Sequence, residues 1–508
     1  MTIDGDAAYQ VLLAHDARFD GRLFVGVTST GIYCRPICRV RMPARRNCRF
    51  FATPAQAEAE SFRPWLKCRP EIAPGPGLPW TVMDASRTLA RQAANALDEF
   101  AVNGDAPSVA DIAARLGVSD RHLRRIFFAE HGVTPLQYLQ TRRLLLAKQL
   151  LTDTQMPIAQ IALSSGFRSL RRFNAAFVDG YRMNPTRLRR AVPRAGARDT
   201  TAGEPADSSA RAASAGSAAA ITVTLGYRPP LDSRSLLAFI AQRAIPGIES
   251  TSADGIRRTV RAGIAGASGG WLEVRFAPTQ ARVQLSFAPA LGPASGTVIA
   301  LVRRWLDLDA APDTIAETLT GLPGEPGLRL PGSTDAFELA VRAVLGQQVT
   351  VAAARTLARR LVERFGSGIA TPWPDIDRTF PAPTDLASVA IERIAELGII
   401  RSRAGAIQAL ASQWHELAPL LAPGASPEAL VERLRSLPGI GPWTAHYIAM
   451  RALGWPDAFP PGDVAALKAL HRLFDIDSER AAAQHAEGWR PWRAYALLRL
   501  WNSLGVTP

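Results

Sequence analysis

All four cysteines of this 508-residue chain lie in one short stretch near its start, at Cys34, Cys38, Cys48 and Cys68. Thiolates are both nucleophiles and zinc ligands, so such a cluster indicates metal or thiol chemistry rather than disulfides. The N-terminus lacks the basic start and apolar run of a signal peptide, and no window is apolar enough to cross a bilayer. We therefore expect a cytoplasmic protein with reduced thiols and no membrane partner.

A second pattern that could do chemistry lies near the other end of the chain. In LRSLPGIGPWTAHYIAM (434–450), Gly439 and Gly441 lie between two helical patterns. Glycines there let backbone N–H groups at a helix start approach a phosphate, because no side chain is in the way. Asp463 follows in AFPPGDVAALK, at the start of a helix that begins near Val464, where the helix dipole favours its charge. The residue suits an N-cap or a reactive carboxylate beside DNA.

Charge and composition divide the chain into parts. The net charge is +14, and most of the basic excess lies in residues 1–200, which suits a polyanionic partner such as DNA. The segment 194–220 is rich in small residues without apolar periodicity, and it predicts a flexible linker. The run APGPGLPW (73–80) predicts a shorter break. The breaks leave three blocks, which are 1–75, 81–193 and 221–508.

The middle block contains a helix-turn-helix pattern twice. In SVADIAARLGVSDRHLRRIF (108–127), apolar residues at helical spacing precede Gly117, which permits a left-handed turn, and Ser119 suits the N-cap of a second helix. The pattern recurs around Gly166 in PIAQIALSSGFRSLRRFNAAF. Basic residues of the two second helices are candidates for reading a major groove. They are Arg121, Arg124, Arg125, Arg168, Arg171 and Arg172.

The tandem spacing and the closing GYRMNPTRLRR (180–190) resemble the AraC-type transcription-activator domain over the whole block. The resemblance implies an all-α domain at 81–193 whose two reading helices bind promoter DNA, with RNA polymerase as a further partner. An ordinary helical bundle with arginines on its solvent face is the alternative.

The first block resembles the N-terminal domain of the Ada adaptive-response proteins, in FVGVTSTGIYCRPICRVRMPARRNCRFF (24–51) and FRPWLKCRP (62–70). In that family two cysteines four apart and two more three apart bind zinc, and the first accepts a methyl group from a DNA phosphotriester. The resemblance implies a small α/β domain at 1–75 in which Cys34 is the methyl acceptor and Cys38 and Cys68 are further zinc ligands.

The chain departs from the Ada pattern at Trp65, which stands where the family has its third cysteine. An indole cannot ligate zinc, which leaves three alternatives. Cys48 supplies a fourth thiolate, or water or His15 completes a site of three cysteines. In the third alternative, the site holds no zinc. A degenerate domain kept for phosphate contacts is a further alternative. Transfer from O6-alkylguanine is not expected, because it needs a second active cysteine and none follows Cys68.

The last block resembles the helix-hairpin-helix DNA glycosylases, and among them the AlkA-type 3-methyladenine glycosylases. The segments that indicate this branch are LGYRPPLDSRSLLAFIAQRAIPGIE (225–249), FELAVRAVLGQQVTVAAARTLARRLVERFG (337–366) and RPWRAYALLRLW (490–501). The resemblance implies a small mixed α/β subdomain at 221–305 and a helical glycosylase domain at 306–508. It also implies excision of alkylated bases from double-stranded DNA without a cofactor.

The residue types fit hydrolysis of a flipped base. Gln348 would fill the gap in the duplex, and Gly439 and Gly441 would bind DNA phosphate. The stacking surfaces for an electron-poor, cationic purine would be Trp443, Tyr447 and Trp501. Asp463 would stabilise the oxocarbenium-like sugar or activate water. Glycosylases of this superfamily that also cut the backbone carry a Schiff-base lysine at the position of Trp443, so we expect a monofunctional enzyme.

The three blocks together predict a multidomain, mainly α protein with α+β parts. Its predicted function is excision of alkylated bases of the 3-methyladenine and 7-methylguanine type by a glycosylase fused to a regulator of the response to alkylation. Two alternatives stay open. In one, a transcription regulator carries a glycosylase-like domain that only binds DNA; in the other, a glycosylase carries a degenerate methyl-sensing domain.

Overall fold

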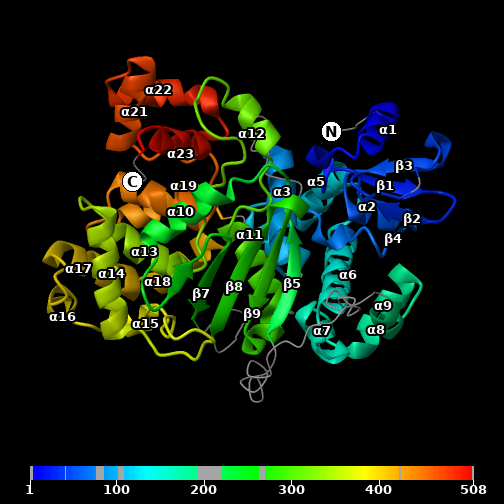
Figure 1. Cartoon of the computed structure of the whole chain (residues 1–508), viewed down its shortest axis with the longest axis horizontal. Coiled ribbons are helices and arrows are strands. Elements are labelled where there is room, and N and C mark those ends of the chain that lie inside the picture. Colours follow the sequence, from blue (N-terminus) through cyan, green and yellow to red (C-terminus); the bar gives the residue numbers. More distant parts are fainter. Residues whose placement is uncertain are drawn as a thin grey trace, which may run out of the picture.

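The computed structural model describes residues 4–40, 42–75, 85–100, 108–191, 220–261, 269–422 and 425–505. The predicted linker lies outside the described residues except for Ala220, and so does the predicted break from residue 76 onward. Within the described ranges, no helix has both the length and the apolar character that a bilayer crossing requires. Figure 1 shows the five-stranded sheet between an N-terminal half and a helical C-terminal part.

The N-terminal part is a small four-stranded sheet of order β3-β1-β2-β4. Its elements are α1 (Gly5–Leu13), β1 (Phe24–Val27), β2 (Ile32–Cys34), β3 (Cys48–Phe51), α2 (Pro54–Ala59) and β4 (Arg63–Pro64). β2 pairs in parallel with β4, with Tyr33 opposite Pro64. This register brings the end of β2, where Cys34 lies, beside the segment that follows β4.

Seven helices follow in the described residues up to 191. They are α3 (Ala85–Phe100), α4 (Val109–Arg115), α5 (Asp120–His131), α6 (Pro135–Asp153), α7 (Ile158–Ser164), α8 (Leu170–Tyr181) and α9 (Pro185–Ala191). The two predicted turns are left-handed, with φ of 69° at Gly117 and 76° at Gly166. Ser119 and Ser169 cap α5 and α8 by accepting from the backbone N–H groups of the residues three positions on. Both predicted helix-turn-helix units are therefore present.

The mixed subdomain is an antiparallel sheet of order β5-β9-β8-β7-β6 with two helices. Its elements are β5 (Ile221–Gly226), α10 (Ser233–Arg243), β6 (Glu249–Thr251), β7 (Gly255–Val260), β8 (Gly270–Ala277), β9 (Arg282–Phe287) and α11 (Ser295–Trp305). Alternate residues of β8 are buried, which is the period of two expected for a sheet with one covered face.

The C-terminal part is helical and has its own core. Its helices are α12 (Pro312–Thr318), α13 (Ala336–Leu345), α14 (Val351–Phe365), α15 (Pro383–Ala387), α16 (Ile391–Ala395), α17 (Arg401–Ser412), α18 (Trp414–Leu417), α19 (Pro427–Arg435), α20 (Pro442–Ala452), α21 (Val464–Phe474), α22 (Glu479–Ala486) and α23 (Arg493–Ser503). Helices α13, α20 and α23 contribute fully buried side chains to this core, among them Phe337, Ile448 and Trp501. The mainly helical, multidomain fold class is confirmed.

The helix-turn-helix part and the mixed subdomain share one hydrophobic core. Phe173 and Phe177 of α8 lie in the same cluster of buried side chains as Val223 of β5 and Leu285 of β9. The Gln149 side chain on α6 donates to a main-chain carbonyl of β5 at 2.8 Å. The two parts therefore pack directly on each other, although the predicted linker separates them in the sequence.

The N-terminal part joins this body through buried charges. Lys148 of α6 pairs with Glu71, and their side chains are 1% and 0% exposed. The fully buried guanidinium of Arg228 donates to the backbone carbonyls of Asp20 at 3.0 Å and Asp309 at 2.8 Å, and also to that of Gly75. Buried charges are costly unless they find such partners, so these contacts hold the parts in one arrangement.

Glu58 links the N-terminal part to α6 and makes stability depend on pH. It accepts from the hydroxyls of Tyr33 at 3.0 Å and Thr141 at 2.7 Å. Burial raises the pKa of Glu58 from 4.5 to about 7. The folded chain therefore binds this proton more tightly than the unfolded chain, and the free energy of unfolding falls as pH rises from 4.5 to 7.

We predict that Glu58→Gln removes this pH dependence. At pH 8 the variant should be more stable than the parent chain by about 1 to 2 kcal/mol, which is less than the full shift because the side chain is only partly buried. At pH 4.5 the two should be alike. Denaturant melts at both pH values check this, and an equal difference at both would show that Glu58 does not titrate between them.

Candidate active site and cysteine cluster

Asp463 is a buried carboxylate at the start of α21. It is 8% exposed and caps the helix by accepting from the backbone N–H of Ala466 at 2.7 Å. The indole Nε1 of Trp443 donates to its Oδ2 at 2.8 Å, and the indole Nε1 of Trp501 donates to its Oδ1 at 3.1 Å. Both oxygens are thus held by N–H donors, which fixes the orientation of the charge.

Three helices supply this arrangement. Trp443 lies in the first turn of α20 and Trp501 near the end of α23, where it is 1% exposed. One turn after Trp443, the Tyr447 ring stacks on its indole, with ring centroids 5.0 Å apart and an interplanar angle of 11°. Trp501 therefore supports the carboxylate from within the core, whereas the stacked rings of Trp443 and Tyr447 are only partly buried.

A cavity of about 120 Å³ lies beside the stacked pair. Its lining residues are Arg243, Leu339, Arg342, Ala343, Gly346, Val349, Val351, Ala354, Arg355, Ala358, Trp443, Tyr447 and Arg451. Asp463 does not line it and contacts it only through Trp443. The site is therefore a stacked aromatic pair that lines a cavity and whose Trp443 indole also binds the Asp463 carboxylate.

Sequence reasoning missed the arginines of this cavity. The Arg451 guanidinium donates to the Tyr447 hydroxyl at 2.9 Å. Burial alone would raise the pKa of Tyr447, but the cations of Arg451 and Arg243 outweigh it and lower that pKa. Arg243 comes from α10 of the mixed subdomain, and burial lowers its own pKa to about 10. No sequence signal marks Arg243, because only the packing of the two subdomains brings it here.

The predicted hairpin connects α19 and α20. Gly439 has φ of 79°, and a Cβ there would lie 2.9 Å from that of Ala406, so a side chain would be strained and crowded. Gly441 is the N-cap of α20 and has no atom near its missing Cβ. Both glycines are exposed. The hairpin thus presents bare backbone at a helix N-terminus, as phosphate binding requires.

Gln348 lies on an exposed turn between α13 and α14 and has φ of 53°, a left-handed conformation that is unusual for a residue with a side chain. The turn is fastened to the hairpin by Gln347, whose Nε2 donates to the Gly439 carbonyl at 2.9 Å and to the Thr444 hydroxyl at 3.1 Å. Arg403 donates to the Gln347 carbonyl. The strained residue therefore protrudes from a fixed position near the hairpin.

The predicted DNA-reading arginines lie on or next to the second helices of the two units. All six are exposed, and they are Arg121, Arg124, Arg125, Arg168, Arg171 and Arg172. Arg124 pairs with Asp120 one turn earlier at 3.0 Å, which orients its guanidinium along α5. Their exposure leaves these side chains accessible to a nucleic acid.

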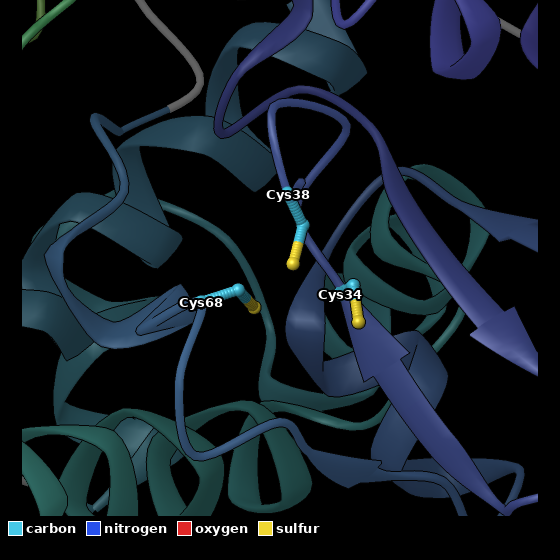
Figure 2. Close-up of side chains that lie close together, drawn as sticks. All are labelled: Cys34, Cys38 and Cys68. Carbon is cyan, nitrogen blue, oxygen red and sulfur yellow. The ribbon is translucent and has the colours of Figure 1, made fainter. Parts of the chain in front are cut away.

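Cys34, Cys38 and Cys68 form a cluster in the N-terminal part. Figure 2 shows their side chains directed toward one another from the end of β2, the following loop and the segment after β4. Their three sulfur atoms all lie within 4.8 Å of one another. Hydrogen bonds from Cys34 and Cys68 lower the pKa of Cys38 to about 4, whereas the pKa of Cys34 is raised. Among the three thiols, Cys38 therefore loses its proton most readily.

Neither Cys48 nor His15, the two side chains considered as a fourth ligand, joins this cluster in the described part of the chain. Cys48 pairs with Val27 across the sheet, and its sulfur lies 3.5 Å from the Ala44 carbonyl. The His15 ring lies against the Pro36 carbonyl at 3.4 Å. Trp65 packs against the cluster instead of supplying a thiolate. The closed four-thiolate zinc site of the family therefore does not fit this chain.

Four protein-family profiles match the chain. They are the metal-binding domain of Ada at residues 7–71, a helix-turn-helix domain at 112–191, the AlkA N-terminal domain at 222–335 and the HhH-GPD superfamily base excision DNA repair protein at 341–494. The resemblances predicted from the sequence are confirmed by these matches.

Three curated relatives extend these matches. "Probable bifunctional transcriptional activator/DNA repair enzyme AlkA" of Mycobacterium tuberculosis (strain H37Rv) is 35% identical, over 99% of this chain and 97% of the relative. "DNA-3-methyladenine glycosylase 2" of Escherichia coli (strain K12) is 34% identical, over 56% of this chain and 98% of that protein. "Bifunctional transcriptional activator/DNA repair enzyme AdaA" of Bacillus subtilis (strain 168) is 29% identical, over 36% of this chain and 82% of that protein.

We predict that Trp501 and Asp463 are energetically coupled. Trp501→Phe removes the indole N–H from the carboxylate, and a hydrogen bond to a charged group contributes about 1.5 to 3 kcal/mol. Trp501→Phe should therefore lower the free energy of unfolding by about 1 kcal/mol more in the parent chain than in the Asp463→Asn background. Denaturant melts of the parent, the two single variants and the double variant measure this difference. Trp489→Phe, in the same core, is the control and should cost the same in both backgrounds. Equal costs for Trp501→Phe would mean that the carboxylate does not depend on this indole.

Proposed function

The chain belongs to the family of bifunctional proteins that join a transcriptional activator to an AlkA-type DNA repair enzyme, and from this we propose that its C-terminal half excises alkylated bases from DNA at Asp463. The observation that carries the proposal is the buried carboxylate held by two indoles beside a stacked aromatic pair. A charge placed this way is oriented before the substrate arrives, so it costs no reorganisation during the reaction.

The reaction we propose is hydrolysis of the N-glycosidic bond. As that bond breaks, the electron pair leaves with the base and positive charge develops on the sugar, where the Asp463 carboxylate stabilises it. Water then adds its hydroxyl at the sugar carbon and releases a proton. Oδ1 accepts both the Trp501 indole N–H and the Ala466 backbone N–H, whereas Oδ2 accepts only the Trp443 indole N–H and keeps acceptor capacity for the sugar or the water.

The cavity supports a substrate base that is already positively charged. Among the described residues that line it, none is a carboxylic acid or a histidine that could protonate a departing base. Alkylation at a purine ring nitrogen supplies the positive charge beforehand, so no strong acid is required. The Trp443 and Tyr447 rings offer π-faces to such a base. We therefore propose bases of the 3-methyladenine and 7-methylguanine type as substrates.

The DNA itself would be held at the hairpin and the neighbouring turn. The exposed backbone at Gly439 and Gly441 suits a phosphate, and the protruding Gln348 suits the space that a flipped base leaves. Gln347 links the hairpin to the turn, so the phosphate-binding backbone and Gln348 keep a fixed distance from each other.

In the N-terminal half, we propose that the six exposed arginines of the helix-turn-helix units bind promoter DNA and that RNA polymerase is a further partner. Cys34 holds the family position of the methyl acceptor. Hydrogen bonds with Cys38 and Cys68 raise its pKa, and a thiophilic metal held by the cluster would favour the thiolate that accepts a methyl group. Zinc would have three cysteine ligands here. A glycosylase whose methyl-sensing domain is degenerate remains the second candidate, and Trp65 is the observation that favours it.

We predict that Asp463→Asn lowers base release by at least about 100-fold, because it removes the charge that stabilises the transition state. DNA affinity should stay within about twofold, since the hairpin backbone is unchanged. The assay is release of free 3-methyladenine and 7-methylguanine from methylated DNA by the purified chain, with anisotropy for binding.

The matched control is Asp475→Asn at the other end of α21, where the carboxylate is 98% exposed and contacts neither indole. It should excise bases at the parent rate. Unchanged release by Asp463→Asn would overturn the proposed role, and no release by the parent chain would favour a regulator whose glycosylase-like part only binds DNA.

We predict that the enzyme leaves the DNA backbone intact. Trp443 carries no amine for a Schiff base, and Lys468 is exposed on α21 beyond the first turn. Sodium borohydride added during turnover should therefore trap no covalent protein–DNA adduct, and strands should break only after alkali. A trapped adduct that disappears in Lys468→Ala would contradict the monofunctional assignment.

A further inference from the structure

The cysteine cluster has three sulfur donors and no fourth. Cys34, Cys38 and Cys68 converge, and no other histidine, cysteine or carboxylate of the described residues completes their group. Zinc prefers four ligands in structural sites, so three sulfurs leave it dependent on an outside donor. A centre that forms only three bonds would be satisfied by this cluster alone.

The surroundings of the cluster favour an uncharged centre. Ile32, Cys34 and Cys38 are 8%, 7% and 8% exposed, and the Trp65 ring packs against them. Three thiolates with a divalent ion carry a net negative charge, which is costly to bury without a partner. The neighbouring guanidinium of Arg35 is shared with Asp20, to which it donates at 2.7 Å, so it offsets such a charge only in part. Three thiolates with a trivalent ion are neutral.

We propose that this cluster is a binding site for trivalent arsenic, taken up as arsenous acid. Arsenic(III) is thiophilic, forms three bonds in a pyramid and keeps a lone pair where zinc needs a fourth ligand. Soft thiolates select soft ions of this kind. The indole of Trp65 occupies the neighbourhood from which the family's remaining cysteine would come, and an apolar ring tolerates a lone pair.

The exchange balances without an oxidant or reductant. Three arsenic–sulfur bonds form and three arsenic–oxygen bonds break. The three hydroxyl groups leave as water, with the protons that the thiols still carry and with a solvent proton for each sulfur that is already a thiolate. Cys34 is consumed in the process, so arsenic and a methyl group would compete for the same sulfur. The proposal is independent of base excision, because Asp463 and its partners lie in the other half of the chain.

Sodium arsenite added to the reduced full-length chain tests the proposal. Native mass spectrometry should show one arsenic gained and three protons lost per chain, with an ultraviolet arsenic–sulfur band that saturates at one equivalent. Cys34→Ser, Cys38→Ser and Cys68→Ser should each weaken binding by more than about 100-fold, since even changes outside the ligand shell cost 10- to 100-fold in metal sites. Cys48→Ser is the matched control and should bind like the parent.

Trp65→Cys provides a second test, because this variant gains a sulfur ligand instead of losing one. The variant should bind one zinc per chain and resist its displacement by arsenite, while the parent should lose any zinc to arsenite. Base release from methylated DNA should be unchanged in every variant, which shows that the chain is folded. A parent chain that retains zinc against excess arsenite, or a Cys48→Ser variant weakened as much as Cys38→Ser, would overturn the proposal.

Discussion

A single buried carboxylate is the constraint around which the C-terminal half is arranged. At 8% exposure, Asp463 can remain charged only if donors replace the water it has lost. The donors come from its own helix, from α20 through Trp443 and from α23 through Trp501. These helices must converge on one point for the charge to be tolerated, so the same packing that stabilises the fold also orients the carboxylate that we propose acts in base excision.

Buried charges also decide how the halves of the chain relate. Lys148 with Glu71, and Arg228 with the backbone of Asp20, cross the boundaries between parts. Pulling the parts away from one another would leave these groups unpaired, and breaking one buried pair typically costs about 3 to 5 kcal/mol. The helix-turn-helix arginines and the hairpin backbone are therefore carried on one body, and DNA bound at one surface has a fixed orientation relative to the other.

The sequence predicted those features that depend on neighbouring residues. The turns at Gly117 and Gly166, and the hairpin at Gly439, follow from local backbone requirements that only a few residue types meet. The roles of Arg243 and Gln347 could not be predicted from the sequence, because they arise where segments far apart in the sequence meet. The sequence could not show for the same reason whether Cys48 is a fourth zinc ligand. It lies near the other cysteines in sequence, but its pairing with β1 turns its sulfur toward a loop carbonyl.

The domain that contains Trp65 is held by buried contacts that involve no metal. Small zinc domains gain most of their stability from the metal and unfold when a ligand is lost. Here Arg35 pairs with the buried Asp20, and Glu71 and Glu58 are bound by residues of α6. The contacts to Glu71 and Glu58 come from α6, outside the domain, so the domain has support that an isolated zinc domain lacks. This support does not depend on the residue at position 65, and the three sulfurs of Cys34, Cys38 and Cys68 still converge where Trp65 replaces the family's third cysteine.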